Sequence, residues 1–486
     1  MLCTTLALLF SITIAQASPP RPRNATANAC EQIAGTISGA SAVYFPNTSN
    51  YTNDIEHWAT SSVLNATCSV EPGTVEDVAV IIKVIGSTKT PFAIKGGGHA
   101  TNQGFSSTTG VQIAMSRFKD IKLSDDKATV DVGAGCIWDE VYLALNGTGV
   151  NAPGGRVPGV GVAGFTLGGG YTFQSSQYGP AIDNIASYEL VLPNGTITTV
   201  LPGDDLFFAL RGAFNNYGIV TKFTFVTHPQ TDVYGGLIQI AGEYFDDLTK
   251  AIAAFAVNNT DTKASILPAY LYSNGTSYSI ITVFYDSPSP PDNAFFGLLD
   301  IPRTSSDISA RSYYDVLEAQ LPIAPISPDV TAKFASVNVL QYTPTLLETF
   351  RNLSISYGQS LAQYDPTFLT AFYVEPFDDT LYMHGTDSAY PPDRSRPLRP
   401  TNVFFSFANS SLYDFMHAQQ NDATNAIRAA ADTEGQNITN AFQYSNYALE
   451  EVTAEQLFGD NVPRLEAIQA AVDPEGVMKL TGGYKV

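Results

Sequence analysis

Residues 154–170 read GGRVPGVGVAGFTLGGG and contain eight glycines in seventeen positions. A second glycine-rich stretch, GGGHATNQG at residues 96–104, contains one histidine. Glycine at this density lets backbone N–H groups approach a ligand closely, and successive N–H groups can bind a pyrophosphate without lysine. Tight turns between strands would also use glycine. Because two such stretches lie in one strand-rich region, they favour a dinucleotide ligand.

The region from Glu71 to Thr227 alternates strand and helix patterns. A capping box at residues 74–77 predicts the start of a helix, and WDEVYLAL (138–145) predicts another. The patterns that predict strands are PFAIKGGG (91–98), ATVDVGAG (128–135), the Asn-Gly hairpin SYELVLPNGTITTV (187–200) and GIVTKFTFVTHP (218–229).

The usual catalytic motifs are absent from the sequence. It has no P-loop, no H-E-x-x-H, no G-x-S-x-G and no Cys/His metal spacing. Gly159, Gly161 and Gly164 match G-x-G-x-x-G. However, a proline-containing loop precedes them, and FTLGGG follows where a helix is required. A Rossmann dinucleotide fold is therefore disfavoured.

The 486 residues suggest two or three domains at about 150 residues each. From residue 230 to 421 glycine becomes rarer, and aromatic strands such as SYSIITVFYD (277–286) alternate with longer helical stretches, which predicts an α+β domain. A short helix is expected over residues 463–472.

The chain is acidic and has few charged residues. Lys plus Arg is 25 against 46 for Asp plus Glu, so the net charge is −21. This balance excludes nucleic acid and anionic membranes as partners, because both bind basic surfaces. Charged residues make up only 15% of the chain, so other groups must keep its surface hydrated.

The N-terminus predicts secretion. LALLFSITI (6–14) followed by Ala-Gln-Ala is typical of a signal peptide at residues 1–17, although an apolar strand is the alternative. No later segment is apolar enough to span a membrane. In an oxidising compartment Cys30 and Cys68 are expected to form a disulfide, and Cys136 is expected to be an inert buried thiol. Glycosylation is expected at eleven N-x-[S/T] sequons: Asn24, Asn47, Asn50, Asn65, Asn146, Asn194, Asn258, Asn274, Asn352, Asn409 and Asn437.

Four tracts resemble the FAD-linked oxidases of the berberine bridge enzyme type. They are KGGGHATNQGFSS (95–107), VGVAGFTLGGG (160–170), DNIASYELVLPNGT (183–196) and GAFNNYGIVTKFTF (212–225). FQYSNYALEE (442–451) and the C-terminal GGYK are also similar to that family. The resemblance implies a two-domain α+β fold: a PCMH-type FAD-binding domain at residues 30–229, a substrate domain at 230–421 with an antiparallel sheet backed by helices, and a closing segment at 422–486 that returns to the FAD domain.

The resemblance also implies which residues hold FAD. His99 matches the histidine that bonds covalently to the flavin ring, and Asn446 would be a polar neighbour of the flavin. The other residues expected to contact FAD are Gly96, Gly97, Gly98, Thr101, Gly104, Gly155, Gly161, Gly164, Gly168, Gly169, Gly170, Ile219 and Val220. Many relatives attach the flavin a second time through a cysteine, but Val157 stands at that position here, so attachment through His99 alone is expected. Val160 matches the position that controls oxygen access, and a small residue there favours an oxidase.

The implied activity is a hydride transfer from a small alcohol, phenol, alkaloid-like or other secondary metabolite to FAD, with O2 reoxidising the cofactor to give H2O2. A base must take the proton of the substrate hydroxyl. Tyr444 and Tyr447 are the first candidates and Glu375 is the second, while Asp378, Asp379 and Tyr390 are unranked options. A structural role for both tyrosines is the alternative. A carbohydrate or oligosaccharide oxidase and a non-catalytic secreted glycoprotein that retains the fold are the competing functions. The protein is expected to be a monomer.

Overall fold

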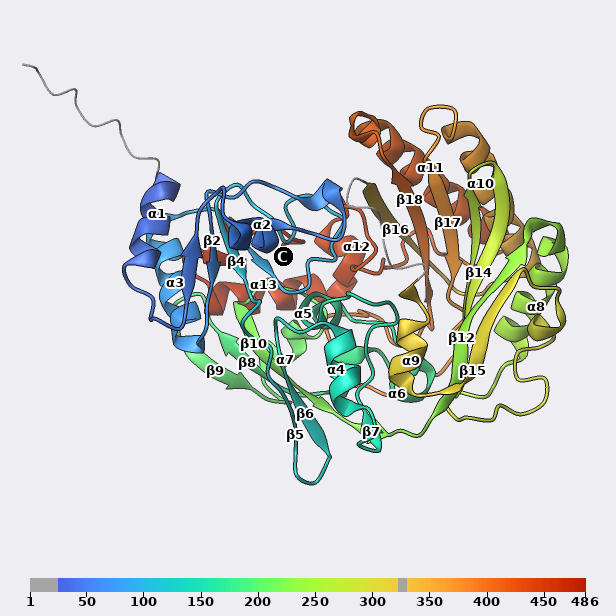
Figure 1. Cartoon of the computed structure of the whole chain (residues 1–486), viewed down its shortest axis with the longest axis horizontal. Helices are drawn as coiled ribbons and strands as arrows, with labels where there is room; N and C mark the ends of the chain where they lie inside the picture. Colours follow the sequence, from blue (N-terminus) through green and yellow to red (C-terminus); the bar gives the residue numbers. More distant parts are fainter. Residues whose placement is uncertain (1–24, 322–329) are drawn as a thin grey trace, which may run out of the picture.

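The computed structural model describes residues 25–321 and 330–486. Two groups of elements lie side by side (Figure 1). The first group contains a four-stranded sheet of order β1-β2-β4-β3 and a five-stranded sheet of order β5-β6-β10-β8-β9. These strands are β1 (Ala42–Tyr44), β2 (Cys68–Glu71), β3 (Phe92–Lys95), β4 (Val111–Ala114), β5 (Ile121–Leu123), β6 (Thr129–Gly133), β8 (Ile185–Val191), β9 (Ile197–Val200) and β10 (Ile219–Val226). A short pair, β7 (Val150–Asn151) and β11 (His228–Pro229), lies at their edge.

The helices of the first group come from both ends of the chain. They are α1 (Ala25–Ala34), α2 (Ser49–Ile55), α3 (Val75–Thr88), α4 (Trp138–Leu145), α5 (Val162–Leu167), α6 (Ser175–Tyr178), α7 (Asp205–Leu210), α12 (Ala454–Phe458) and α13 (Val462–Val472). Leu465, Ile468 and Met478 of the closing segment pack in the same hydrophobic core as Val78 and Ile82 of α3. The chain therefore returns to the first group at its C-terminal end.

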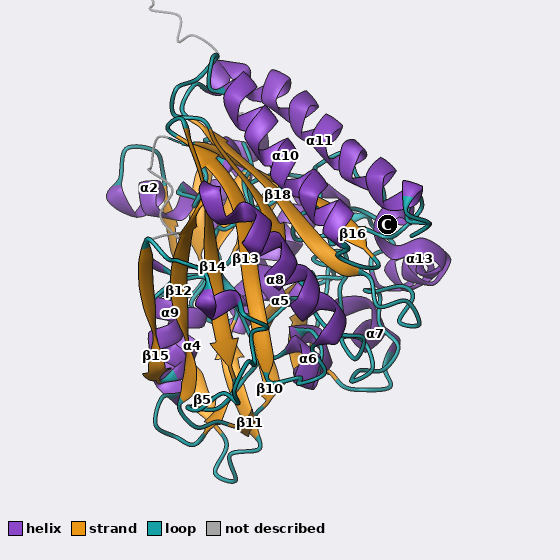
Figure 2. Ribbon diagram, turned by 90° about the vertical axis from the view of Figure 1, so that its right-hand side faces the viewer, coloured by secondary structure: helices purple, strands orange, loops and turns teal. Residues whose placement is uncertain are grey.

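The second group is built on one seven-stranded antiparallel sheet of order β15-β12-β14-β13-β17-β18-β16. Its strands are β12 (Val233–Ala241), β13 (Ala264–Ser273), β14 (Thr276–Tyr285), β15 (Ser305–Arg311), β16 (Thr331–Val339), β17 (Leu369–Val374) and β18 (Arg399–Phe407). Helices α8 (Phe245–Asn258), α10 (Pro344–Leu361) and α11 (Tyr413–Thr433) cover one face of the sheet, as Figure 2 shows, and α9 (Tyr313–Glu318) lies near its β12 side. The predicted α+β fold, with an antiparallel sheet backed by helices, is confirmed.

Several local predictions are confirmed and one is wrong. Thr74 caps α3 by accepting a bond from the Asp77 N–H, and β8 and β9 form the expected hairpin. The sequence predicted no helix after the glycine loop, but α5 forms there with Gly161 and Gly168 as its two caps. The helix ends at Gly168, whose backbone N–H donates to the carbonyls of Gly164 and Thr166. The sheets are not doubly wound, so the Rossmann fold stays excluded.

One predicted boundary falls inside a helix. Residue 421 lies in α11, and the neighbouring Gln420 donates bonds of 3.0 and 2.8 Å to the carbonyls of Lys333 and Val403 in the seven-stranded sheet. We therefore propose that the closing segment begins after Thr433 rather than at residue 422. The other domain boundaries stay predictions.

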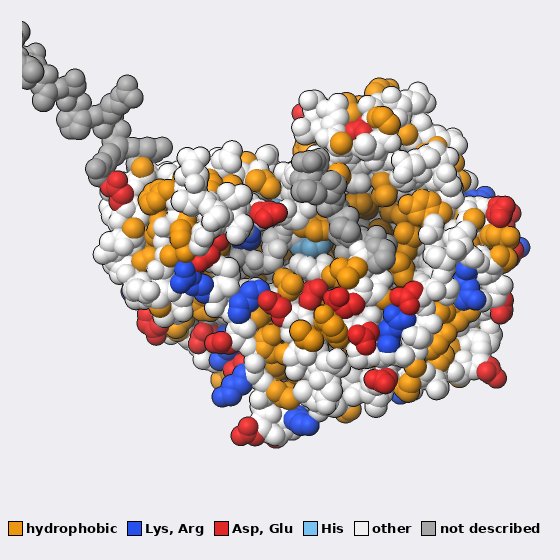
Figure 3. All heavy atoms as spheres, in the orientation of Figure 1, with side chains coloured by type: hydrophobic (Ala, Val, Ile, Leu, Met, Phe, Trp, Pro, Cys, Tyr) orange, Lys and Arg blue, Asp and Glu red, His pale blue; other side chains and the backbone are white. Residues whose placement is uncertain are grey.

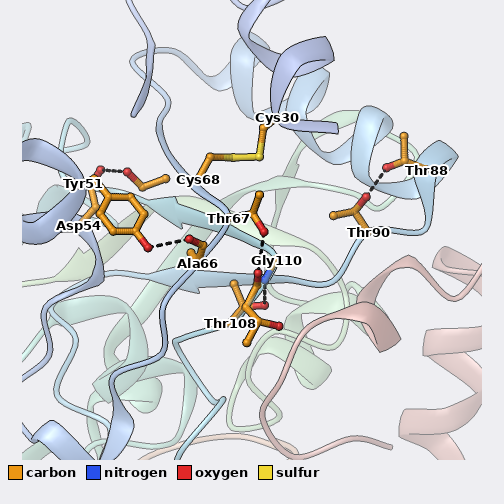
Figure 4. Close-up of a disulfide and its surroundings, with 12 residues drawn as sticks. Cys30, Tyr51, Asp54, Ala66, Thr67, Cys68, Thr88, Thr90, Thr108 and Gly110 are labelled. Atoms are coloured by element: carbon orange, nitrogen blue, oxygen red, sulfur yellow. Dashed lines mark hydrogen bonds between the residues drawn. A yellow bond between two sulfur atoms is a disulfide. The ribbon is translucent and has the colours of Figure 1, made fainter. Parts of the chain in front are cut away.

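The expected disulfide joins Cys30 of α1 to Cys68 of β2, as Figure 4 shows. Cys136 is buried, and burial raises the pKa of its thiol to about 11, as expected of an inert cysteine. None of the helices in residues 25–321 and 330–486 is long and apolar enough to cross a membrane. The predicted signal peptide and Asn24 lie outside the described residues.

Candidate active site

A cavity of about 540 Å³ lies between the glycine-rich stretches and the uncovered face of the seven-stranded sheet. Figure 3 shows the hollow on this side of the molecule, with hydrophobic side chains along its wall. The first group contributes residues of the segments 94–106, 156–167 and 214–220, and the closing segment contributes 444–448 and 483–484. This volume is within the range of sites that bind small molecules and cofactors.

The two glycine-rich stretches touch each other backbone to backbone. A Cβ atom built on Gly97 would lie 2.5 Å from the Cα of Gly161, and one built on Gly161 would lie 2.4 Å from the backbone nitrogen of Gly97. No side chain fits in so small a gap. The glycines at these two positions therefore let the loops form one continuous wall of backbone.

A run of free backbone donors stands along this wall. The N–H groups of residues 97–103 donate to no described residue, and residues 96–102 line the cavity. Buried N–H groups are rarely left without acceptors, and successive free N–H groups bind anions such as phosphates. The loop can hold a pyrophosphate without any lysine, so the site fits FAD.

Ten of the residues expected to bind FAD line the cavity, including His99 and Asn446. The others are Gly96, Gly97, Gly98, Thr101, Gly161, Gly164, Ile219 and Val220. Gly104, Gly155, Gly168, Gly169 and Gly170 do not line it. Four of them are needed for packing; for example, a Cβ on Gly155 would meet the Trp138 ring and one on Gly168 would lie 2.2 Å from the Asn446 side-chain oxygen. Gly104 has open space around it, and glycine is favoured there by its φ of +81°.

His99 is stacked on Trp58, with 4.2 Å between the ring centroids. Its Nε2 atom is buried and has no hydrogen-bond partner among the described residues. Burial lowers the pKa of His99 to about 4, so the ring is neutral at pH 7. A neutral imidazole with a free nitrogen lone pair is the form that can act as a nucleophile.

Val157 and Val160 line the same cavity as His99. The valine that replaces the second attachment cysteine of many relatives therefore faces the cavity that fits FAD. Val160 also accepts a hydrogen bond of 3.0 Å from the Trp138 backbone N–H, which holds this loop against α4.

Arg156, Glu375 and Tyr447 form a largely buried cluster between the second glycine-rich stretch and the seven-stranded sheet. The Arg156 guanidinium donates to Glu375 Oε2 at 2.6 Å and to the Tyr447 hydroxyl at 3.2 Å. Among the described residues, Arg156 and Glu375 are the only side chains with a formal charge that line the cavity. Sequence reasoning missed Arg156, although an arginine inside a glycine-rich stretch was a signal that could have identified it.

Glu375 has one carboxylate oxygen without a partner. Its Oε1 atom is buried without a hydrogen-bond partner among the described residues. Burial raises the pKa of Glu375, while the neighbouring Arg156 opposes that rise. Burial also raises the pKa of Tyr444 to about 12 and that of Tyr447 well above its usual range, so both hydroxyls stay protonated at neutral pH.

The two tyrosines and Asn446 are brought together as expected. The Tyr444 hydroxyl accepts bonds of 3.1 Å from the Gly170 N–H and 2.8 Å from Asn446 Nδ2. The three unranked candidates lie outside the cavity. Asp378 accepts a bond from the Thr380 N–H, Asp379 pairs with Arg399, and Tyr390 is bonded to Tyr171.

The wall on the sheet side is mainly apolar. Leu267 and Leu271 come from β13, Ile280 from β14, Leu369 from β17, and Phe404 from β18. Tyr278, Tyr373, Asn402 and Ser406 add uncharged polar groups. Such a wall suits a ligand with rings or hydrocarbon that offers few polar groups.

Comparison with known proteins identifies the cofactor domain. Residues 66–201 match the family model for an FAD binding domain. An uncharacterized FAD-linked oxidoreductase of Arthroderma benhamiae is 37% identical over 57% of this chain and 57% of its own length. The FAD-dependent monooxygenase tpcD of Cochliobolus heterostrophus is 28% identical over 99% of both chains.

Solved structures share the fold at low sequence identity. The BBE-like 1 protein of Physcomitrella patens has a TM-score of 0.75 at 21% identity and covers 92% of this chain and 97% of its own. A carbohydrate oxidase of Microdochium nivale has a TM-score of 0.76 at 19% identity, covering 95% and 98%. Berberine bridge enzyme has a TM-score of 0.74 at 16% identity, covering 95% and 98%. Residues 66–201 therefore form an FAD-binding domain, the chain is similar to FAD-linked oxidoreductases, and it shares the fold of berberine bridge enzyme.

Proposed function

We propose that the protein is a secreted FAD-dependent oxidase of a small organic substrate, such as an alcohol, phenol or other secondary metabolite. The observation that carries this proposal is one cavity lined by residues 97–102, which have free N–H groups and include His99, and by Glu375, which has one carboxylate oxygen without a partner. Bound FAD supplies the hydride acceptor and passes the electrons to O2, which gives H2O2.

His99 would hold the flavin through a single covalent bond. Its buried Nε2 atom without a partner and its low pKa support this role. Val157 lines the same cavity and carries no thiol, so no second bond forms. The free N–H groups of residues 97–103 would bind the pyrophosphate, and Ile219 and Val220 would contact the adenine or ribitol end.

Glu375 is the candidate base that the geometry supports best. Its free Oε1 atom can accept the proton of a substrate hydroxyl while the substrate C–H bond gives up its hydride. Tyr444 and Tyr447 remain protonated at neutral pH, which suits them to donate hydrogen bonds that orient the substrate. The apolar sheet wall would exclude water from the reacting atoms.

A carbohydrate oxidase is the second candidate, because one solved structure of this fold carries that name. The apolar wall counts against it, since each buried sugar hydroxyl without a partner costs about 1–3 kcal/mol. The relatives named monooxygenases suggest a third reaction, in which an oxygen atom enters the product. A non-catalytic glycoprotein would have no need of the free His99 and Glu375 atoms.

Secretion is supported by two features. The Cys30–Cys68 disulfide is stable in an oxidising compartment, and all ten sequon asparagines among the described residues are exposed. Neutral glycans at these positions would hydrate a surface with few charges. We propose that the secreted protein is a monomer.

Two measurements test the proposal. Acid precipitation of the purified protein should give a yellow pellet, and a colourless pellet would contradict covalent attachment. A screen for peroxide release should find activity with phenols or apolar alcohols rather than sugars. Turnover under ¹⁸O₂ followed by mass spectrometry of the product separates the reactions, because an oxidase leaves the label in peroxide and a monooxygenase places it in the product.

A further inference from the structure

We infer that Arg156 is a positioning residue that keeps the Glu375 carboxylate ionised and directs its one free oxygen into the cavity. The inference rests on the proposed function, in which Glu375 takes the substrate proton, and it extends that function to a residue outside the expected site. Arg156 is not a catalytic residue in this proposal, because it acts through the Glu375 carboxylate and the Tyr447 hydroxyl.

The geometry leaves Glu375 a single free acceptor. Arg156 donates to Oε2 at 2.6 Å, so that oxygen is occupied. The Glu375 backbone N–H donates to the Tyr342 hydroxyl at 3.1 Å, which fixes the end of the strand that carries the side chain. Oε1 is then the one oxygen of the carboxylate without a hydrogen-bond partner among the described residues, so it is the free acceptor for a substrate hydroxyl.

The Arg156–Glu375 ion pair is buried, so the two charges interact more strongly than they would at the surface. The Arg156 and Glu375 side chains are 7% and 1% exposed. A carboxylate this deeply buried without a cation would take up a proton, because desolvation disfavours the charged form. The guanidinium also lies over the Phe377 ring at 5.8 Å, so its own side chain has little freedom to turn away.

The other titratable groups facing Glu375 are four tyrosines: Tyr342, Tyr373, Tyr444 and Tyr447. All four have pKa values raised by burial and are uncharged at neutral pH. Arg156 is therefore the one cation among the described groups that can hold the carboxylate in its basic form.

Arg156 also links the two walls of the site. It stands in the second glycine-rich stretch, next to Val157, whereas Glu375 follows β17 of the sheet. The same guanidinium reaches the Tyr447 hydroxyl of the closing segment at 3.2 Å. One side chain thus sets the protonation of the base and its position relative to the loop that carries the predicted cofactor contacts.

The test is an infrared pH titration of Glu375 in the holoenzyme. The protonated-carboxyl band of Glu375 is assigned by its loss in Glu375→Gln. In Arg156→Met the midpoint of this band should move upward by about 1 to 3 pH units, because an adjacent cation lowers a carboxyl pKa by that amount. Arg156→Lys keeps the charge and should restore most of the wild-type midpoint.

Arg211→Met is the matched control. Arg211 is 3% exposed and pairs with Asp183, but it lies outside the cavity. It should lower the unfolding temperature without moving the Glu375 midpoint. An unchanged midpoint in Arg156→Met, or equal shifts in both variants, would overturn the inference. The titration needs no substrate, so an absence of peroxide release would refute the proposed function without deciding the role of Arg156.

Discussion

The two walls of the cavity are made of different parts of the chain. The wall on the side of residues 96–102 is mostly backbone, with glycines in contact and a run of free N–H groups. The wall on the sheet side is made of side chains from five strands, chiefly leucine, isoleucine, phenylalanine and tyrosine. A wall of backbone leaves no room for an added side chain, and its binding groups are N–H groups that do not depend on the identity of a side chain. A side-chain wall can be changed one residue at a time, so it can set which substrate binds.

The largest expected effect comes from adding one methyl group to the backbone wall. Gly97→Ala would place a Cβ 2.5 Å from the Gly161 Cα, so the two loops must separate. We expect the purified variant to lack FAD, measured by flavin absorbance. Gly39→Ala is the control, because its Cβ meets nothing within 4 Å. Full flavin content in Gly97→Ala would show that the loop contact does not shape the site.

The second-largest expected effect is loss of the proposed covalent bond between His99 and the flavin. His99→Ala should give a colourless acid pellet, since the only proposed attachment atom is removed. Val157→Ala should leave the pellet yellow, and Val157→Cys should gain a second bond if residue 157 faces the flavin. Mass spectrometry of flavin-bearing peptides reads out both. A yellow pellet from His99→Ala would place the attachment on another residue.

On the sheet side, loss of the base is expected to reduce turnover strongly. Glu375→Gln should lower kcat by about 10²- to 10⁴-fold, which is the usual contribution of a general base. Because burial raises the pKa of Glu375, wild-type activity should fall with decreasing pH at a higher pH than for an ordinary glutamate. Stopped-flow measurement of the rate of flavin reduction at a series of pH values follows this fall in activity. If the same fall persists in Glu375→Gln, another residue is the base.

The smallest effect should come from the apolar wall. Leu271→Asn replaces a side chain that is 4% exposed and lines the cavity, so an apolar substrate would lose about 1–3 kcal/mol of binding. KM should rise about 10- to 150-fold, with flavin content unchanged. Leu143→Asn, at a residue 57% exposed on α4, is the matched control. Improved activity on sugars with no loss on phenols would point to the carbohydrate reaction.

Much of the fold could be read from local patterns. The caps, periodicities and the Asn-Gly hairpin predicted α3, α4, α13 and the β8–β9 pair because these signals act within a few residues. The helix α5 was missed because its glycine caps are also typical of loops. The predicted boundary at residue 421 lies inside α11, because a composition change does not show where a helix ends.

The candidate site could be predicted in part. Ten of the fifteen expected cofactor residues line the cavity, and the five that do not are glycines, four of which are required for packing. The sequence cannot distinguish a glycine that leaves room for a ligand from a glycine that leaves room for a neighbouring ring, because both kinds occur in the same glycine-rich pattern. Trp138 against Gly155 is an example.

The sequence by itself predicted a secreted protein that binds a dinucleotide. The features behind this prediction are two glycine-rich stretches with His99, few charges, a strongly acidic balance and a cysteine pair suited to an oxidising compartment. Only the tertiary structure decided which acceptor faces the cavity and which cation holds it. Arg156 and Glu375 are 219 residues apart and meet at 2.6 Å. Their charges influence each other only once folding has removed the water between them, and no local pattern records that contact.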